Sequence, residues 1–544
     1  MNPSVNPVAY TERVTNSIFL NPASENEIIL IISSLNNKAS NGPDKLPTNL
    51  LKNNCITFAR ILTICFNKIV ETGTYPNCLK VARVIPILKT GDSDNVSNYR
   101  PISTLSVFSK IFEKLLMKRM SSFLVNNNIL YNLQYGFKTG SSTLIAITEL
   151  VDFIIDKIEN KNVVGALFLD LKKAFDTLNH NILLSKLECY GIRGTAYDII
   201  RSYLHNRKQF VAINDVESSF MPITTGVPQG SNIGPLLFLL YINDISKLPL
   251  KGLARLFADD TSLFYPAKST TIVIQQMEHD LKLLNEYFNS NLLSLNLSKT
   301  KYLICHSRRK ILGDHSDPLI GNYSIEKVEY FKYLGITLDC TLSWGEHIKM
   351  LEKKVSSFCG VLWRISKFVP RHTLLTIYHA LTHSQLSYLI SVWGRTCISY
   401  LNRLQTLQNR CLKIIFNRPI RFPTLQLYCD SSHNILPLAK LCDFQTIMFM
   451  FDNIRNSNSA HNLNFISIDR QRTTTRQSHH LQRVRSTSTF GQKRISFIGP
   501  TKYNLLPNSL KLISSRILFK TRLKQHLKST INCHKPICFT SLLY

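Results

Sequence analysis

Two adjacent carboxylates, Asp259 and Asp260, interrupt the apolar stretch "LARLFADDTSLF". Leucine and phenylalanine on both sides are strand formers, so the acidic pair falls at a break that fits a hairpin turn. Asp is common in turns, and such a pair indicates little by itself. Because two divalent cations need several hard oxygen ligands at one point, the pair becomes a metal site only if a third carboxylate joins it.

Asp170 can supply that third carboxylate. It lies at the end of "VVGALFLDL", whose β-branched and apolar residues predict a buried strand. A charge at the end of a buried strand is costly unless it is paired or metal-bound. The two strand-end acidic sites suffice to hold two cations, the arrangement that clamps the attacking and leaving oxygens in nucleotidyl transfer. Oxygen ligands and substrate phosphates favour Mg²⁺.

The charge balance indicates a polyanionic partner. Lys and Arg number 65 against 35 Asp and Glu, a formal net charge of +30 over 544 residues. After Asp469 no acidic residue occurs, whereas Lys and Arg continue from Arg470 to Lys535 with Phe490 and Tyr503 among them. A solvated tail without function is one interpretation. The interleaved aromatic residues favour a folded, basic, nucleic-acid-binding element.

Length and composition exclude several classes of protein. A 44% hydrophobic share and 544 residues predict an ordered chain of two to four domains. The thirteen cysteines are scattered without a Cys-x-x-Cys pair, so we expect reduced thiols rather than a disulfide framework or a zinc ribbon. No signal peptide is evident, and the longest apolar run, "IGPLLFLLYI", is too short to span a bilayer. We expect an intracellular protein, in the nucleus or cytoplasm, with no membrane partner.

Periodicity predicts helices and strands in an irregular order. Apolar spacing predicts a helix from Glu25 to Leu35, another near Phe58 to Val70, and long helices between Leu351 and Arg410. Strands are predicted at "VARVIPIL", "VVGALFLDL", "KQFVAIN" and as a pair in "VEYFKYLGITLD". Because the elements do not alternate regularly, the sequence favours an α+β sheet domain with a helical neighbour over a doubly wound fold.

Several motifs together resemble a known family. The order of a strand-end Asp, then "GVPQGSNIGPLLF", then "FADD" resembles the successive motifs of reverse transcriptases. The sequence resembles the jockey-type branch of non-LTR retrotransposons, densely from Ser24 to Arg410. The further motifs that occur in family order are "VARVIPILKTGD", "NYRPIS", "LQYGFKTGSST", "LDLKKAFDTLNH", "NLLSLNLSKTKYL" and "YFKYLGITLD". The resemblance implies a right-hand polymerase. Its parts would be an N-terminal helical extension (1–60), fingers and palm of antiparallel sheet and helices (61–345), a helical thumb (346–430) and a basic C-terminal region (431–544).

The resemblance also implies roles for the acidic residues. Asp170 and Asp259 match the two principal metal ligands of the family, and Asp260 matches the supporting one, for two Mg²⁺ ions. Lys299 in "LSKTKY" matches the lysine that protonates the leaving pyrophosphate, a role that requires proximity and a suitable pKa. An ordinary surface lysine is the alternative interpretation of Lys299.

Five further residues match the nucleotide pocket of the family. Phe175 occupies the position of the bulky gate that excludes a ribose 2′-hydroxyl, although core packing is its alternative role. Gln229 and Gly230 match the floor of the nucleotide and template pocket, where an amide can hydrogen-bond and glycine clears space. Arg100 and Lys89 match the residues that hold the incoming triphosphate, Arg through its planar fork and Lys as a point charge. A solvated strand edge is the alternative for Lys89.

Other matches are structural, and a few positions depart from the family pattern. Phe331 and Gly335 resemble the primer grip hairpin, and Phe137 and Gly140 fall in the template-contacting fingers segment. The family usually has Trp before Lys80, and also at two positions that are tyrosine here; the three departures are Leu79, Tyr287 and Tyr503. Each keeps an apolar group. Such elements usually encode an N-terminal endonuclease, and no nicking site can be assigned in this chain.

The resemblance implies an RNA-directed DNA polymerase. Its partners would be an RNA template, a DNA primer, deoxynucleoside triphosphates and, as a ribonucleoprotein, the element RNA. A catalytically inactive or repurposed RNA-binding protein that retains the fold is the competing hypothesis, and a Mg²⁺-dependent extension assay discriminates the two. A maturase-like partner of an intron RNA is a further alternative, which would require a dedicated RNA-splicing domain.

Overall fold

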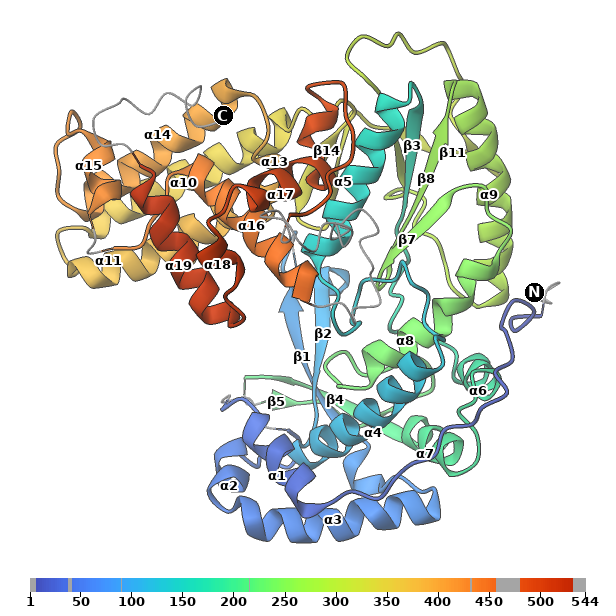
Figure 1. Cartoon of the computed structure of the whole chain (residues 1–544). Helices are drawn as coiled ribbons and strands as arrows, with labels where there is room; N and C mark the ends of the chain where they lie inside the picture. Colours follow the sequence, from blue (N-terminus) through green and yellow to red (C-terminus); the bar gives the residue numbers. More distant parts are fainter. Residues whose placement is uncertain are drawn as a thin grey trace, which may run out of the picture.

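The computed structural model describes residues 6–37, 42–89, 91–214, 216–430, 433–455 and 480–531. Helices and sheets are mixed without regular alternation along the chain (Figure 1). The prediction of an α+β fold is therefore confirmed. Two five-stranded sheets and two two-stranded sheets lie in the N-terminal and middle parts, and the described C-terminal part is mainly helical.

The central sheet has five strands in the order β12-β9-β3-β8-β7. Its middle strand, β3, pairs antiparallel with both β8 and β9. The strand bounds are β3 Val163–Leu169, β7 Leu253–Phe257, β8 Asp260–Ala267, β9 Lys301–Cys305 and β12 Glu326–Lys327. The predicted strand and acidic hairpin thus lie side by side in one sheet.

Every residue of β3 is buried, because both faces of the strand are covered. Val163, Leu167 and Leu169 belong to one apolar core. Val164 and Phe168 belong to a second core on the opposite face, as the two-residue period of a strand requires. Helix α9 (Thr270–Ser290) packs on the first face and α5 (Thr143–Glu159) on the second (Figure 1). Burial on both faces holds β3 in place and therefore also positions Asp170, which follows the strand directly.

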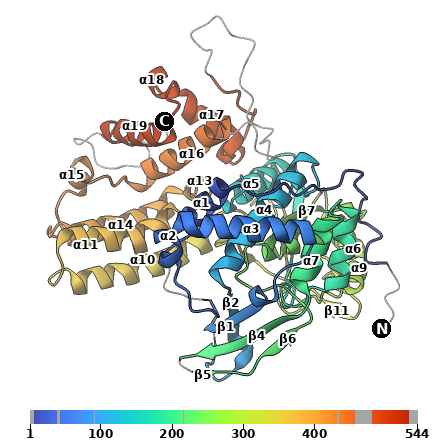
Figure 2. The same ribbon diagram turned by 90° about the horizontal axis from the view of Figure 1, so that it is seen from below.

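A second sheet lies beside the N-terminal helices (Figure 2). Its strand order is β2-β1-β4-β5, with β6 paired to β4. The strand bounds are β1 Val81–Leu88, β2 Tyr99–Thr104, β4 Arg207–Ile213, β5 Val216–Glu217 and β6 Met221–Ile223. The helices of this part are α1 Glu25–Ser34, α2 Thr48–Asn53, α3 Cys55–Thr72, α4 Val107–Asn126, α6 His180–Cys189, α7 Thr195–Leu204 and α8 Gly234–Ile242.

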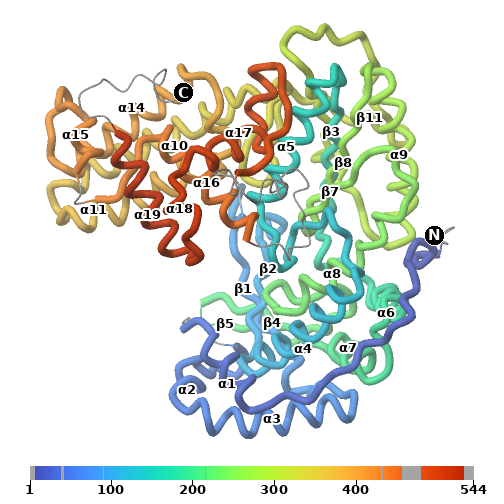
Figure 3. The backbone as a smooth tube through the Cα atoms, in the orientation of Figure 1, coloured from blue at the N-terminus to red at the C-terminus, as the bar shows by residue number. Residues whose placement is uncertain are grey.

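The C-terminal part forms a helical body beside the sheets (Figure 3). Two hairpins precede it: β10 (Leu319–Ile320) with β11 (Tyr323–Ser324), and β13 (Tyr330–Tyr333) with β14 (Ile336–Asp339). The helices are α10 Gly345–Ile365, α11 Arg371–Ile377, α12 Ser384–Ser387, α13 Ile390–Trp393, α14 Ile398–Ile415, α15 Thr424–Cys429, α16 Leu438–Arg455, α17 Ile495–Asn504, α18 Asn508–Lys511 and α19 Arg516–Ser529.

Most predicted elements are present, and the expectation of reduced thiols fails at one described cysteine. The helix predicted from Glu25 ends one residue early, and it begins where the Ser24 hydroxyl accepts a hydrogen bond from the Glu27 backbone N–H. Cys429 is disulfide-bonded, whereas ten other cysteines of the described ranges are free. Scattered cysteines carry no local pattern from which such a bond could be predicted.

Candidate active site

An open cleft of about 1580 Å³ lies between the two sheets. Its lining comes from β1, β2, β4, the turn after β3, the loop before α8, the β7–β8 turn and the segment before β9. Eight of the nine residues assigned from the sequence to catalysis or substrate binding line it: Lys89, Arg100, Asp170, Phe175, Gln229, Gly230, Asp259 and Lys299. Asp260 is absent from the lining, although it is adjacent to Asp259.

Strand register brings the acidic residues together. Leu169 of β3 is paired with Thr261 of β8, so the next step of this antiparallel ladder sets Asp170 opposite Asp260. Residues directly opposite in such a ladder have Cβ atoms about 4.5–5.5 Å apart. The three aspartates therefore lie near one another at the same end of the central sheet, close enough for their charges to interact.

The electrostatics of the site agree with this proximity. Burial, followed by the charges of Asp259 and Asp170, raises the pKa of Asp260 to about 6. Burial and the charge of Asp170 also raise the pKa of Asp259. Mutual repulsion of carboxylates has this effect because each opposes ionisation of the next. A cation bound among them would relieve the repulsion.

The acidic hairpin turn is held by a residue that the sequence did not single out. Ala258 and Asp259 form the turn between β7 and β8, and Ala258 adopts a left-handed φ of 56°. The Gln134 side-chain oxygen accepts hydrogen bonds from the backbone N–H groups of Ala258 (3.0 Å) and Gly136 (2.8 Å). The segment around Gln134 pairs in parallel with β7 at Leu256. This segment therefore supports the turn that carries Asp259.

Asp170 is contacted by two residues from the segment before β9. The Asn296 side-chain nitrogen donates to the Asp170 carboxylate at 2.8 Å, and the Asn296 backbone N–H donates to the Asp170 carbonyl at 2.7 Å. The Lys299 ammonium lies 3.8 Å from the same carboxylate. Lys299 thus lines the cleft and lies next to an acidic residue.

The donor set fits a hard divalent cation. Three carboxylates at adjacent strand ends are the ligand type that Mg²⁺ prefers. Among the described residues no three Asp, Glu, His or Cys side chains already converge as a metal cluster. One oxygen of Asp170 is instead engaged by Asn296 and Lys299.

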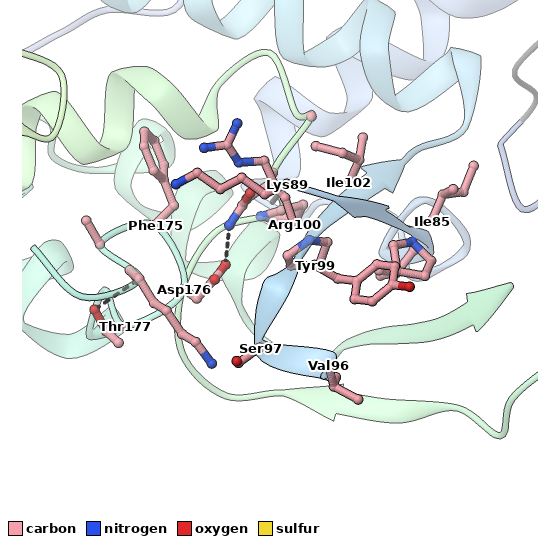
Figure 4. Close-up of a pocket in the computed structure, with 18 of the residues that line it drawn as sticks. Ile85, Lys89, Val96, Ser97, Tyr99, Arg100, Ile102, Phe175, Asp176 and Thr177 are labelled. Carbon is pink, nitrogen blue, oxygen red and sulfur yellow. Dashed lines mark hydrogen bonds between the residues drawn. The ribbon is translucent and has the colours of Figure 1, made fainter. Parts of the chain in front are cut away.

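Cationic residues face the acidic edge from β1 and β2. Arg100 is paired with Ile87 in the β1–β2 ladder, and the backbone N–H of Lys89 donates to Asn98 at 2.9 Å. Figure 4 shows Lys89 and Arg100 extending toward the segment that carries Phe175. Both charges lower the pKa of Asp259, against the larger effect of its burial. Positive charge therefore lies close enough to the carboxylates to act on Asp259.

Phe175 and Gly230 shape the other wall of the cleft. The Phe175 ring packs on Phe238 with centroids 4.6 Å apart and meets Phe137 edge-on at 6.4 Å. Gly230 has a φ of 130°, and a Cβ atom there would lie 2.3 Å from the Ser103 carbonyl oxygen. Only glycine fits this close approach. Phe175 therefore both packs against other aromatic rings and lines the cleft.

Comparisons with known proteins agree with this geometry. The family described as "Reverse transcriptase (RNA-dependent DNA polymerase)" matches residues 87–338. Similar proteins from Drosophila melanogaster include the "Probable RNA-directed DNA polymerase from transposon BS", 30% identical over 74% of this chain and 46% of that protein. The "RNA-directed DNA polymerase from mobile element jockey" is 27% identical over 74% of this chain and 45% of its own length. Residues 87–338 therefore match the reverse transcriptase family, and over about three quarters of the chain the similar proteins are RNA-directed DNA polymerases of mobile elements.

The chain spans a little under half the length of these curated relatives. Among solved structures, "Structure of apo telomerase from Candida Tropicalis truncated from C-terminal domain" is matched with a TM-score of 0.32 and 12% identity, over 48% of this chain and 54% of that chain. An overlap this low supports no further argument.

Within the described ranges no helix is both long and apolar enough to cross a bilayer.

The hairpin assigned to the primer grip packs against the centre of the reverse transcriptase domain. The Phe331 ring, on β13, stacks on Phe168 of β3 with centroids 4.1 Å apart. Gly335 turns the hairpin with a φ of 87° close to the Tyr388 ring. Phe168 precedes Asp170 by two residues, so this stack couples the hairpin to the strand that ends at the acidic site. Gly140 lies elsewhere, in a smaller cavity that α16 also lines.

The described parts of the C-terminal region contain helices α16 to α19, and some of their positive charge is used internally. Arg494 is buried, with ion pairs to Asp152 at 3.0 Å and Asp156 at 2.8 Å on α5 of the reverse transcriptase domain. Arg516 pairs with Asp452 at 2.7 Å. These cations are therefore neutralised by the chain itself. The rest of the tail between 456 and 479 and beyond 531 lies outside the described residues.

Proposed function

We propose that this chain is the RNA-directed DNA polymerase of a non-LTR retrotransposon, which extends a primer 3′-hydroxyl with deoxynucleoside triphosphates on an RNA template. The observation that carries the proposal is the β3–β8 register, which brings Asp170 beside Asp259 and Asp260 at a cleft with cations on its opposite wall. The family match and the names of the relatives support the same reaction.

The acidic residues would hold two Mg²⁺ ions. Asp170 and Asp259 would be the principal ligands, with Asp260 in support. When bound, these ions would stabilise the charge that develops on the attacking and leaving oxygens during in-line displacement at the α-phosphate. Asp170 would be held in position before substrate arrives, because β3, which it follows, is buried on both faces.

The remaining assigned residues would bind and select the nucleotide. Lys89 and Arg100 would hold the triphosphate through charge-assisted hydrogen bonds. Phe175 would exclude the ribose 2′-hydroxyl, a role that its firm packing on Phe238 supports because a gate must not yield. Lys299 would donate a proton to the leaving pyrophosphate, since its ammonium lies near Asp170 at the cleft.

A right-hand arrangement is the architecture that we infer for this polymerase. Residues 61–345 would be fingers and palm, 346–430 the thumb, and 431–544 a basic C-terminal region, after an N-terminal extension of residues 1–60. The change from sheets to helices after β14 supports the boundary near 345. The first boundary would fall within α3, which continues from Cys55 to Thr72.

Nucleic acid would be held mainly through its backbone. The net charge of +30 supports binding to phosphates without sequence readout, and such binding weakens as salt rises because counterions are released. Contacts with A-form geometry and 2′-hydroxyls would favour an RNA template. The element RNA is the partner that this charge would retain as a ribonucleoprotein.

A primer-extension assay on matched RNA and DNA templates tests the proposal. We expect Mg²⁺-dependent synthesis by the wild-type chain, its loss in Asp259→Asn, and unchanged RNA affinity in that variant. Asp198→Asn is the matched control, because this variant removes one carboxylate away from the cleft. Asp198 is half-exposed on α7, where it forms a surface ion pair with Arg201. Wild-type protein that binds RNA but extends no primer would favour the competing hypothesis of a repurposed RNA-binding protein.

A further inference from the structure

Two segments that meet at the cleft are joined by hydrogen bonds from both main chain and side chain. The turn after β3 and the loop before α8 carry Phe175 and Gln229. The backbone N–H of Val227 donates to the Phe175 carbonyl at 2.9 Å, and the Thr225 hydroxyl donates to the Asp176 carbonyl at 3.2 Å. These contacts fix the separation of the two segments.

Their approach is too close for an ordinary side chain. Gly226 has a φ of 78°, and a Cβ atom there would lie 2.6 Å from the Asp176 carbonyl oxygen. The Gly226 carbonyl is in turn 2.8 Å from the His180 ring nitrogen Nε2. The relation of the two segments is therefore built into the backbone, and a side chain that bridges them can act with defined geometry.

Asp176 and Gln229 form that bridge. The Gln229 side-chain nitrogen donates to the Asp176 carboxylate at 2.8 Å, the dashed contact beside Asp176 in Figure 4. An ionised carboxylate can only accept hydrogen bonds. It therefore dictates which end of the amide faces it, and the Gln229 oxygen must be the end that remains free. Within the described part of the chain this oxygen has no other partner.

We propose that Asp176 is a positioning residue that orients the Gln229 amide, so that an acceptor oxygen faces the incoming nucleotide at the cleft. The inference rests on the proposed polymerase function, because it assigns Gln229 to the nucleotide pocket. Asp176 follows the sugar gate Phe175 directly, so one turn supplies both the group that excludes the 2′-hydroxyl and the group that orients its neighbour. Nucleotide affinity, rather than the chemical step, should depend on the pair.

A merely structural role for Asp176 makes a different prediction. If the carboxylate only joined the two segments, removing any other joining bond would have a similar effect. Thr225→Val removes the hydroxyl that donates to the Asp176 carbonyl, and it leaves the carboxylate–amide bridge intact. It is therefore the matched control, because it weakens the connection between the two segments and keeps the orientation of the Gln229 amide.

The test measures nucleotide binding and extension in the full chain with a double-mutant cycle. An asparagine amide can turn either its oxygen or its nitrogen toward Gln229, so Asp176→Asn no longer fixes the orientation of the Gln229 amide. We expect it to raise KM for the complementary deoxynucleotide about tenfold, the scale of one hydrogen bond to the nucleotide, with kcat within about threefold. Gln229→Ala should match it, and the double variant should show no further loss, because Asp176 acts only through Gln229. Thr225→Val should change KM less than about twofold. Additive losses, or a Thr225→Val effect equal to that of Asp176→Asn, would overturn the proposal.

A binding readout separates this inference from the polymerase proposal. The probe is the next complementary deoxynucleotide, titrated against complexes with a dideoxy-terminated primer on an RNA template. About tenfold weaker binding in Asp176→Asn supports the inference even if wild-type protein extends poorly. Equal nucleotide affinity in wild-type protein and Asp176→Asn would overturn the inference, and the polymerase proposal would still stand. Failure of wild-type protein to bind any nucleotide would overturn both.

Discussion

The Asn296 side-chain amide donates a 2.8 Å hydrogen bond to the carboxylate of Asp170, from a residue 126 positions further along the chain. The same residue accepts a hydrogen bond on its side-chain oxygen from the Ser298 hydroxyl at 2.9 Å. Asn296 is therefore held on both sides, and it holds one of the three acidic groups. As the metal ligand that we propose, Asp170 would need less reordering when a cation arrives because its carboxylate is already restrained.

Replacing Asn296 should weaken the cation site more than the fold. We expect Asn296→Ala to lower Mg²⁺-dependent extension about 10- to 100-fold and to raise the Mg²⁺ concentration for half-maximal activity. Primer extension over a Mg²⁺ titration measures both. Ser298→Ala removes the bond on the other side of the amide and is the control; it should cost much less. Equal losses in the two variants would mean that Asn296 only stabilises the loop.

Gly230 should tolerate no side chain. In Gly230→Ala the new Cβ atom would collide with the Ser103 carbonyl, and that backbone cannot retreat because the Ser103 N–H donates to the Gln229 carbonyl at 2.7 Å. We expect loss of extension activity and a lower urea midpoint. Gly321→Ala is the matched control: its φ of 58° is also left-handed, but nothing lies within 4 Å of the added Cβ. It should cost only about 1 kcal/mol of backbone strain. Full activity in Gly230→Ala would contradict the close approach.

Much of this arrangement follows from local pattern. The apolar run ending at Asp170 predicted a buried strand, and the break at Asp259 predicted a hairpin turn, because strand burial and turn chemistry are written in neighbouring residues. The order of the motifs then indicated which strand ends meet. Lys89, Arg100 and their partners across the cleft were found through that resemblance alone.

The supporting residues could not be predicted in the same way. Gln134, Asp176 and Asn296 are common polar residues, and each acts on a partner far away in the sequence. The tail gives the clearest case. Its excess of cations indicated phosphate binding, yet Arg494 is buried on acidic residues of α5 that precede it by more than 300 positions. Which charge meets which is decided by tertiary packing, and no local periodicity records it.

Lys186 should be critical for stability because it is a fully buried cation. Its ammonium lies 2.8 Å from the Asp244 carboxylate and 2.7 Å from the Tyr241 carbonyl, and neither charged side chain is more than 1% exposed. Lys186→Met would leave the Asp244 charge buried and unpaired, so we expect a loss of about 3–5 kcal/mol in the free energy of unfolding.

Urea denaturation measures the effect, and a surface pair supplies the comparison. Lys68→Met breaks the 3.0 Å pair with Glu71, in which both side chains are about two-thirds exposed. This loss should be below about 1 kcal/mol. Adding Asp244→Asn to Lys186→Met should restore part of the stability, since the uncompensated charge is then removed. Additive destabilisation by the two changes would argue against a coupled pair.

Acid should destabilise the helical C-terminal part through its buried histidines. Burial, followed by the nearby charge of Lys354, lowers the pKa of His347 from 6.5 to about 4. The ring lies between Trp344 and Trp393, and its Nδ1 accepts the Thr337 backbone N–H at 3.4 Å. A folded-state pKa below the unfolded value means that the unfolded chain binds more protons between these pH values. Stability is therefore full above about pH 6.5 and is lost as the pH falls toward 4.

The loss of stability follows from the difference between the two pKa values of His347, at about 1.4 kcal/mol per unit of pKa. It should reach roughly 3 kcal/mol once the pH is below the folded-state pKa. Urea midpoints measured between pH 7.5 and 4.5 test it. In His347→Asn the side-chain oxygen can accept the Thr337 N–H but does not titrate in this range, so the slope of stability against pH should decrease. His372→Asn, at an exposed position on α11, is the control and should leave the slope nearly unchanged. An identical slope in wild-type and His347→Asn protein would show that the His347 ring is accessible to protons in the folded state.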